Sequence, residues 1–304
     1  MSLAHVHPGA GPGPGLGTAE LLTVAAVLLV AVGYLWAARR LRRRGDAWPG
    51  SRDVSFGAGG VATAWAAAGA LPGGPFTGHM VEHLLVGMVA PLLVVAARPL
   101  TLVLRSLGPG PARRRVLAVA HSPVVGTLVF PPVAALLDAG GLWVLYRTDL
   151  FAAMRDSPLL GHLVHAHLLA AGLLLTFSVC RLDPVRRRWG VAVRGGTLLA
   201  AGAAHAVLAK TLYALPPPGT GFAAADLRSG ARLMYYGGDL VELALAAVVG
   251  LGWFRARGRT SRSRTVTSVD AGLPQSVRSA RPPMAGPHPA TRPPTGRRPR
   301  TDTP

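Results

Sequence analysis

The segment FTGHMVEHLLVGMVAPLLVVAA, from Phe76 to Ala97, decides the fold of this chain. It is long and apolar enough to cross a bilayer as a helix, and it carries His79, Glu82 and His83 at its leading end. On a helix, His79 and His83 lie one turn apart on the same face, with Glu82 beside them. Because ionisable side chains are costly inside a membrane span, their presence indicates a functional site by default.

Other hydrophobic segments of similar length occur along the chain. Half of its 304 residues are hydrophobic and only 15% are charged, which is typical of a membrane protein. We predict an all-α, polytopic membrane helix bundle with seven transmembrane helices, each near the ~20 residues that cross a bilayer. Their expected ranges are 19–38, 56–71, 79–97, 116–137, 159–180, 195–214 and 233–253. Pro91, Pro131 and Pro132 fall inside these ranges, where we expect them to kink helices.

The basic residues alternate between the two sides of the predicted helices. The chain has 32 Lys and Arg against 13 Asp and Glu, and every basic residue except Lys210 is an arginine. The segments 39–55, 98–115, 181–194 and 255–304 hold 27 arginines, whereas the segments on the other side hold 4. The positive-inside rule then places the N-terminus outside and the C-terminus in the cytoplasm. Because the arginines form short clusters between apolar segments, they indicate membrane topology and no nucleic-acid partner.

The composition divides the chain into three parts. Residues 1–18 are rich in Gly and Pro and lack the basic start of a signal peptide, so we expect a flexible extracytoplasmic tail. Residues 19–254 form the seven-helix transmembrane domain. Residues 255–304 are rich in Arg, Pro, Ser and Thr, and we expect a disordered, basic cytoplasmic tail. Its charge either contacts anionic membrane lipid or serves only as a topology signal.

Ionisable side chains from four predicted helices converge on the outer half of the membrane. A shared polar pocket that opens outward would satisfy all of them, whereas lone charges in lipid are expensive. The candidate metal ligands are His79, His83, His165 and His205, followed by His167 and His162. The candidates for orienting ligands or relaying protons are Glu82, Asp239, Glu242 and Lys210. Only His121, near the inner start of the fourth predicted helix, lies away from this group.

Three chemistries could use such a pocket. Histidines at i, i+4 and at i, i+3 on two helices suit a shared metal, and imidazole suits copper, zinc and iron. The single cysteine, Cys180, leaves histidine, methionine and carboxylate as the available ligands. The same groups could relay protons, or two histidines could hold haem, which is least favoured because no apolar slot lies between single opposed histidines. Each residue taken alone could equally cap a helix or lie among lipid headgroups.

Aromatic residues mark the predicted outer interface. We expect them to be interfacial anchors and not cofactor contacts. They are Trp143, Tyr146, Tyr213, Tyr235 and Tyr236.

The order and depth of these residues resemble the CtaG family of cytochrome c oxidase assembly factors, which have seven predicted spans. The resemblance covers about 19–254. It rests on His79-Met80-x-x-His83, Val89-Ala90-Pro91-Leu92, Arg98-Pro99-Leu100, Leu145-Tyr146-x-x-Asp149-Leu150-Phe151, His165-x-His167 followed by Gly172, Leu182-Asp183-Pro184, His205 and Gly237-Gly238-Asp239. This chain departs from the family pattern at 142–146, which lacks a Trp-His-Pro cluster, and at Glu82, where glutamine is expected.

The resemblance implies a non-enzymatic, multi-pass plasma-membrane protein that helps to mature a haem–copper oxidase. Its implied partners are cytochrome c oxidase subunits and membrane lipid, and its implied cargo is copper for a metal centre on the outer side. A copper or proton transporter is the main alternative, and it would need polar residues through the inner halves of the helices. The segments 89–97, 169–179 and 244–252 contain none that ionise. A structural scaffold whose polar groups only pair with each other is the third possibility.

Overall fold

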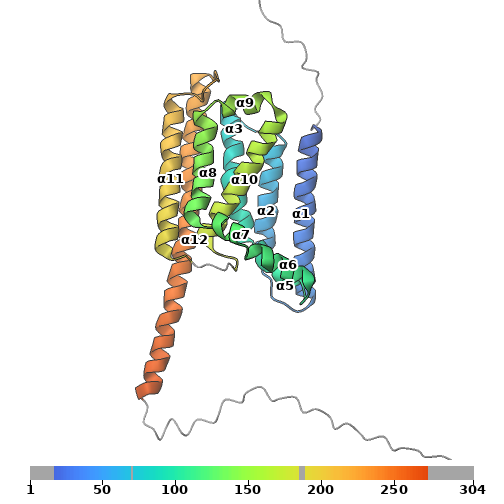
Figure 1. Ribbon diagram of the computed structural model, residues 1–304, viewed down its shortest axis with the longest axis vertical. Coiled ribbons are helices and arrows are strands. Elements are labelled where there is room, and N and C mark those ends of the chain that lie inside the picture. Colours follow the sequence, from blue (N-terminus) through green and yellow to red (C-terminus); the bar gives the residue numbers. More distant parts are fainter. Residues whose placement is uncertain (1–16, 70, 185–188, 273–304) are drawn as a thin grey trace, which may run out of the picture. The chain divides into compact units, whose positions relative to one another are not determined.

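The computed structural model describes residues 17–69, 71–184 and 189–272 (Figure 1). The described residues form helices and no strands, which confirms the all-α class. The chain divides into two compact units, with the boundary after Trp253. The helices are α1 (Thr18–Arg43), α2 (Gly50–Ala67), α3 (Pro75–His83), the π-helix η1 (Leu84–Val89), α4 (Ala90–Ala96), α5 (Pro99–Ser106), α6 (Pro111–Ala120), α7 (Pro123–Leu128), α8 (Pro131–Arg147), α9 (Leu150–Asp156), α10 (Pro158–Cys180), α11 (Val191–Ala214) and α12 (Ala224–Gly272).

Five helical segments of the described chain are long and apolar enough to cross a membrane. They are Glu20–Arg43, Pro75–Ser106, Pro158–Cys180, Val191–Ala214 and Ala224–Arg255. They correspond to the first, third, fifth, sixth and seventh predicted spans. The helices at the other two positions, α2 and α8, do not qualify, but α2 packs on α1 and α4 and α8 packs on α10 and α11 (Figure 1). The count of seven spans and the orientation of the termini stay predictions.

The fourth predicted span, 116–137, is wrong in position. That stretch contains the end of α6, all of α7 and the beginning of α8. Proline has no backbone N–H to donate and fits the first helical position, so Pro123 and Pro131 begin helices after the extended residues Ser122 and Phe130. Pro131 and Pro132 therefore start a helix and do not kink one. The helix that takes the place of the predicted span is α8, with 17 residues.

Pro91 distorts its helix, as predicted. In a regular α-helix its nitrogen would bond the carbonyl of Gly87, but proline has no hydrogen to give and its ring crowds that carbonyl. The chain responds with the wider turn of η1, in which the N–H of Ala90 donates to the carbonyl of Leu85, five residues back. The wide turn begins directly after His83. Single π-helical turns of this kind are frequent at functional sites.

The backbone of η1 lies against the backbone of α10. A Cβ atom placed on Gly172 would overlap the carbonyl oxygen of Gly87 and would lie 3.0 Å from the ring of Pro91. Small residues permit such close approach between membrane helices. The contact therefore sets the spacing between α10, which carries His165, and η1, which directly continues the helix of His79.

Two aspartates tie helix ends to distant parts of the chain. Asp226 in α12 accepts hydrogen bonds from the backbone N–H groups of Phe76, at 2.9 Å, and Thr77, at 3.0 Å, in the first turn of α3. Asp183, after α10, accepts one at 2.8 Å from the N–H of Thr101 in the first turn of α5. First-turn N–H groups have no partner inside their own helix, and the helix dipole favours a carboxylate there. The two ties lie at opposite ends of the bundle (Figure 1).

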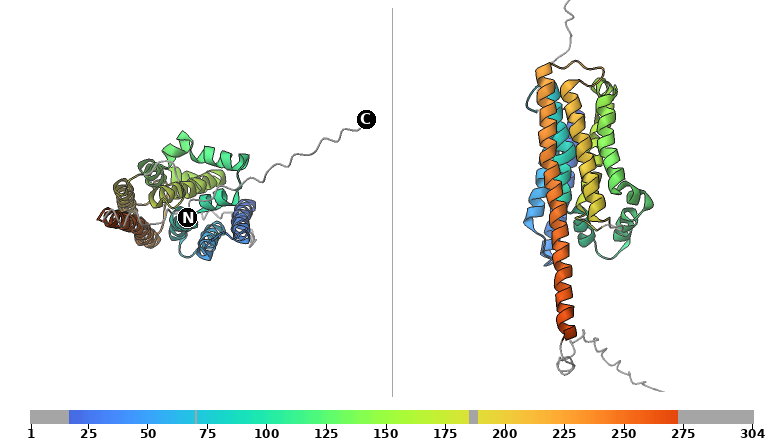
Figure 2. Two further views of the ribbon diagram at one scale, coloured as in Figure 1. Left: turned by 90° about the horizontal axis from the view of Figure 1, so that it is seen from below. Right: turned by 90° about the vertical axis from the view of Figure 1, so that its left-hand side faces the viewer.

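Helices α11 and α12, up to Trp253, run side by side at one flank of the first unit, and α1 lies at the opposite flank (Figures 1 and 2). Between them, one buried cluster surrounds Phe76, Met80 and Tyr146 near the end of the bundle where α9 lies. A second cluster fills the other half with apolar side chains, among them Leu175 and Leu245. The half of the bundle away from α9 is therefore filled mainly by apolar side chains.

Helix α12 is longer than predicted. Residues 255–272, expected to be disordered, are helical in the described structure. The segment contains no proline before Pro274, so nothing in it forbids a helix. The rest of the predicted cytoplasmic tail, 273–304, and residues 1–16 of the predicted N-terminal tail lie outside the described residues.

The contact between Gly87 and Gly172 gives a stability prediction. The substitution Gly172→Ala should destabilise the protein by about 1–3 kcal/mol, because the added methyl group must push η1 away from α10. Thermal unfolding of the purified protein in detergent should show a lower midpoint. Gly33→Ala is the matched control, since a Cβ there meets no atom within 4 Å. An unchanged midpoint for Gly172→Ala would show that the close contact does not constrain the bundle.

Candidate metal site

Three of the predicted residues meet where α3 faces α10. These residues, His79, Glu82 and His165, are called the triad below. One potential ligand atom from each lies within 4.8 Å of the others. Glu82 lies between the two imidazoles, with Oε1 2.9 Å from Nε2 of His165 and Oε2 3.7 Å from Nδ1 of His79. The triad therefore offers two nitrogens and a carboxylate at one point.

The second nitrogen of each triad histidine has its own partner. Nε2 of His79 lies 2.9 Å from the hydroxyl of Tyr146, and Nδ1 of His165 lies 2.7 Å from the carbonyl oxygen of Gly161. Histidines that bind metal usually hold their other ring nitrogen in this way, which fixes the orientation of the ring. Nε2 of His165 is buried and approaches Glu82 in a direction that makes no hydrogen bond. An ion bound at the triad would therefore have to replace the contact between Nε2 of His165 and Oε1 of Glu82.

Two more of the predicted histidines form a separate, deeper pair. Nε2 of His83 lies 3.4 Å from Nε2 of His205, and the side chains belong to α3 and α11. Only 1% of His83 and 5% of His205 is exposed, whereas the triad side chains are partly exposed. Both Nδ1 atoms of the pair are buried without a hydrogen bond. Glu242 of α12 places Oε1 3.6 Å from Nδ1 of His205.

Glycines make room for this pair on α11 and α12. A Cβ on Gly238 of α12 would collide with the ring of His205, and a Cβ on Gly202 of α11 would collide with the carboxylate of Glu242. Each helix therefore has a glycine at the point where a polar side chain of the other helix packs against it. This arrangement explains Gly238, whereas a Cβ on the neighbouring Gly237 would collide with the side chain of Leu84. Asp239 itself forms no hydrogen bond or ion pair with another described residue.

Tyr146 joins the triad to the pair. Its hydroxyl contacts His79, its ring centroid lies 6.5 Å from that of His83, and its side chain is fully buried. The prediction that Tyr146 is an interfacial anchor is therefore wrong. The error follows from the misplaced fourth span, because α8 continues to Arg147 and carries Tyr146 inward. The sequence signal for a buried Tyr146 was the motif from Leu145 to Phe151. Phe151 also packs on His79, with ring centroids 4.8 Å apart.

Two predicted ligands on α10 lie outside the cluster. His162 is exposed, and its Nδ1 lies 2.5 Å from the carbonyl of Pro158 on its own helix. His167 is also exposed, two residues from His165 and so on nearly the opposite face of the helix. Its Nε2 lies 3.2 Å from the carbonyl of Leu137 in α8.

Asp138 was missed by the sequence analysis, which placed it in a loop. It lies inside α8 and lines a cavity of about 300 Å³ between α8, α9 and α10. His167 lines the same cavity, whose other walls are mainly apolar. Neither residue contacts the triad in the described structure.

Lys210 also lies outside the cluster. Its side chain is exposed on the surface of α11, with the ammonium group 5.3 Å from the ring centroid of Tyr235. The predicted role of Lys210 as a relay group has no contact to support it.

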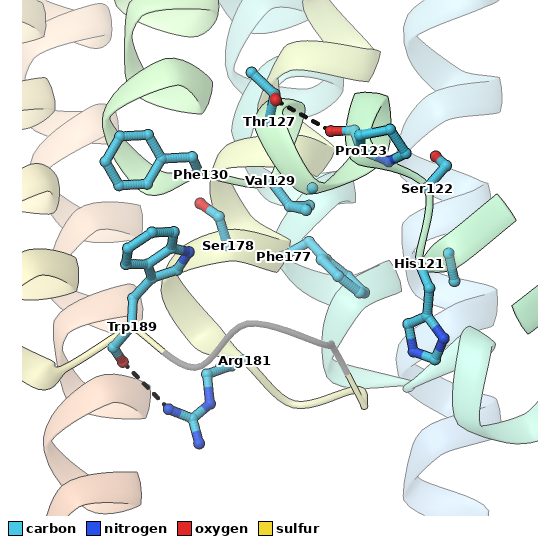
Figure 3. A pocket seen from close by; sticks show the side chains of 12 residues that line it. His121, Ser122, Pro123, Thr127, Val129, Phe130, Phe177, Ser178, Arg181 and Trp189 are labelled. Carbon is cyan, nitrogen blue, oxygen red and sulfur yellow. Dashed lines mark hydrogen bonds between the residues drawn. The ribbon is translucent and has the colours of Figure 1, made fainter. Parts of the chain in front are cut away.

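A cavity of about 580 Å³ is lined by residues of α7 and of the C-terminal end of α10 (Figure 3). His121, Phe177, Arg181 and Trp189 line it, and Arg181 donates a hydrogen bond to the carbonyl of Trp189 at 3.2 Å. None of the candidate ligands lines this cavity. The predicted separation of His121 from the polar group is therefore confirmed.

Comparisons with known proteins agree with these motifs. The model of the family described as cytochrome c oxidase caa3 assembly factor, Caa3_CtaG, matches residues 32–256. An uncharacterized protein of Mycobacterium leprae is 29% identical over 197 residues, and uncharacterized proteins of Mycobacterium bovis and Mycobacterium tuberculosis are each 32% identical over 200 residues. These matches cover 62% of this chain but only 30% of each relative. No solved structure matches the chain.

Proposed function

Because the chain belongs to the cytochrome c oxidase caa3 assembly factor family, we propose that it handles copper for the oxidase through the triad and the deeper pair. The observation that carries this proposal is the arrangement of His79, Glu82 and His165 around one point, with the second nitrogen of each imidazole already occupied. Imidazole and carboxylate ligands without thiolate fit a copper ion that must later leave. The protein acts as a carrier and not as an enzyme.

The two histidine groups suggest an order of binding. The triad side chains are partly exposed, so an ion can reach them first. The pair of His83 and His205 is buried, and Glu242 places a carboxyl oxygen 3.6 Å from Nδ1 of His205. Tyr146 contacts His79 and packs near His83, so a change at one group is transmitted to the ring positions of the other. We assign the triad as the entry site and the pair as a second imidazole site for the same ion.

The direction of the bundle supports handling on the outer side of a plasma membrane. The C-terminal ends of α1 and α10 and the segment from α5 to α7 lie at the end remote from α9 (Figure 1). Most of the clustered arginines before residue 255 belong to these parts of the sequence or directly follow them. If arginine-rich loops face the cytoplasm, the triad end faces outward and the chain crosses the membrane seven times. Copper centres on the outer side of an oxidase subunit are then within reach.

The apolar half of the bundle argues against a transporter. Below the pair, Val95, Leu175, Leu198 and Leu245 belong to an apolar cluster. The buried ionisable side chain beside it is Arg194, near the start of α11, which donates a hydrogen bond to the carbonyl of Val179 at 2.8 Å. An ion moving through this region would lose its polar partners. A purely structural scaffold would pair its buried polar atoms, whereas Nδ1 of His83 is buried with no hydrogen bond or ion pair to another described residue.

The assembly role can be tested on α10 itself. In a deletion strain complemented with His165→Ala, the copper content of the oxidase and its activity should fall on the order of tenfold or more, because a ligand is lost. His162→Ala is the matched control, since it removes an exposed histidine from the same helix. Both variants must accumulate in membranes at wild-type levels. Normal oxidase copper and activity in the deletion strain itself would overturn the assembly role.

Copper binding can be tested on the purified protein. Titration with copper should show binding that weakens on the order of 10–100-fold in Glu82→Ala and in Tyr146→Phe, which lose a ligand and a ring-orienting hydroxyl respectively. Tyr236→Phe is the control, because Tyr236 is exposed and distant in the chain from the triad contacts. Wild-type affinity in both Glu82→Ala and His165→Ala would exclude the triad as the copper site. The assembly role would still be decided by the experiment in the deletion strain.

A further inference from the structure

A groove with cations and tyrosines lies where α11 ends and α12 begins. Its volume is about 310 Å³, and it is walled by the two helices, with Ala209 and Ala231 at its base. The side chains that define this basic–tyrosine groove are Lys210, Tyr213, Arg228, Arg232, Tyr235 and Tyr236. It lies on the outer surface of these helices, whereas His205 and Glu242 on the same helices are directed into the bundle.

The three cations of the groove face aromatic rings. The ammonium group of Lys210 lies 5.3 Å from the ring centroid of Tyr235. The guanidinium of Arg232 lies 5.5 Å from the ring of Tyr213 and donates a hydrogen bond to its hydroxyl at 3.2 Å. The guanidinium of Arg228 lies 5.8 Å from the same ring. Rings hold these cations in place through cation–π attraction but leave most of their N–H donors free.

No carboxylate in the described chain forms an ion pair with Lys210, Arg228 or Arg232. Lys210 is exposed and yet belongs to the candidate membrane span Val191–Ala214, one turn before its end. A lysine in that position extends toward the headgroup region, where phosphate groups supply the missing anion. The groove thus has positive charge at headgroup depth and no protein group to neutralise it.

An apolar surface continues from the groove along the same helices. Val207 lies one turn before Lys210 on α11, and Leu240 and Leu243 lie one and two turns after Tyr236 on α12. All three are exposed, Leu240 by 70% and Leu243 by 67%. A free phosphate ion would use only the cations, whereas a phospholipid would use the cations for its headgroup and this surface for an acyl chain.

We propose that the basic–tyrosine groove binds an anionic phospholipid, with its phosphate between Lys210 and Arg232 and its acyl chain along Val207 and Leu240. The proposal needs the helices to lie in a membrane but does not depend on copper binding. A lipid held there bridges α11 and α12 from outside. It thereby steadies the two helices that carry His205 and Glu242 on their inner faces.

Native mass spectrometry of the full-length protein in detergent tests the proposal. Wild-type protein titrated with phosphatidylglycerol should retain one lipid more strongly than with phosphatidylcholine. In Lys210→Gln/Arg232→Gln, binding of that first phosphatidylglycerol should weaken on the order of tenfold, because two cations are lost. Arg113→Gln/Arg114→Gln is the control, since it removes the same charge from exposed positions on α6 at the other end of the bundle.

The outcomes distinguish a specific lipid-binding site from nonspecific electrostatic attraction. Equal weakening in both double variants would overturn the proposal, because lipid binding would then follow net charge alone. Displacement of the lipid by millimolar inorganic phosphate or glycerol phosphate would also overturn it, since the apolar surface would contribute nothing. Circular dichroism should show unchanged helix content in both variants. A variant that fails to fold can be replaced by Leu240→Asn, which should weaken phosphatidylglycerol retention while all cations remain.

Discussion

The close approach of Gly87 and Gly172 governs the geometry of the polar centre. Pro91 has no N–H to donate to the carbonyl of Gly87, as a regular helix would require, and the helix widens into η1. The widened turn lies directly after His83 and presses its backbone on α10. The widened turn thus holds the helix that ends at His83 against α10, which carries His165. The polar site depends on a backbone contact that contains no polar side chain.

Helix ends supply the second constraint on the site. Asp226 holds the first turn of α3 from the start of α12, only one turn before His79. The triad therefore lies between two fixed points, the cap at Phe76 and Thr77 and the glycine contact at Gly87. Side chains held this way lose little freedom when an ion binds, since the ordering has occurred during folding. This pre-organisation would favour the metal site that we propose for the triad.

Much of this arrangement follows from the sequence, and the remainder depends on packing. Helical spacing and the arginine clusters were enough to bring His79, Glu82, His83, His165 and His205 to the same half of the bundle. They could not divide these residues into a triad and a pair, because that division depends on which helix packs against each residue of α3: α10 against His79 and Glu82, and α11 against His83. Tyr146 was misjudged because the start of α8 is decided by prolines that also fit a kink. His167 could have been set aside, since two residues along a helix reverse the face.

The exchange of side chains between α11 and α12 has an evolutionary consequence. His205 fills the space over Gly238, and Glu242 fills the space over Gly202, so neither helix can slide along the other without lifting both side chains out. Positions 202 and 242, and positions 205 and 238, can therefore change only as couples: a larger residue on one helix requires a smaller one opposite. Across divergent sequences of this fold, the register between these two helices should be preserved by such compensated exchanges even where the identity of the polar groups drifts.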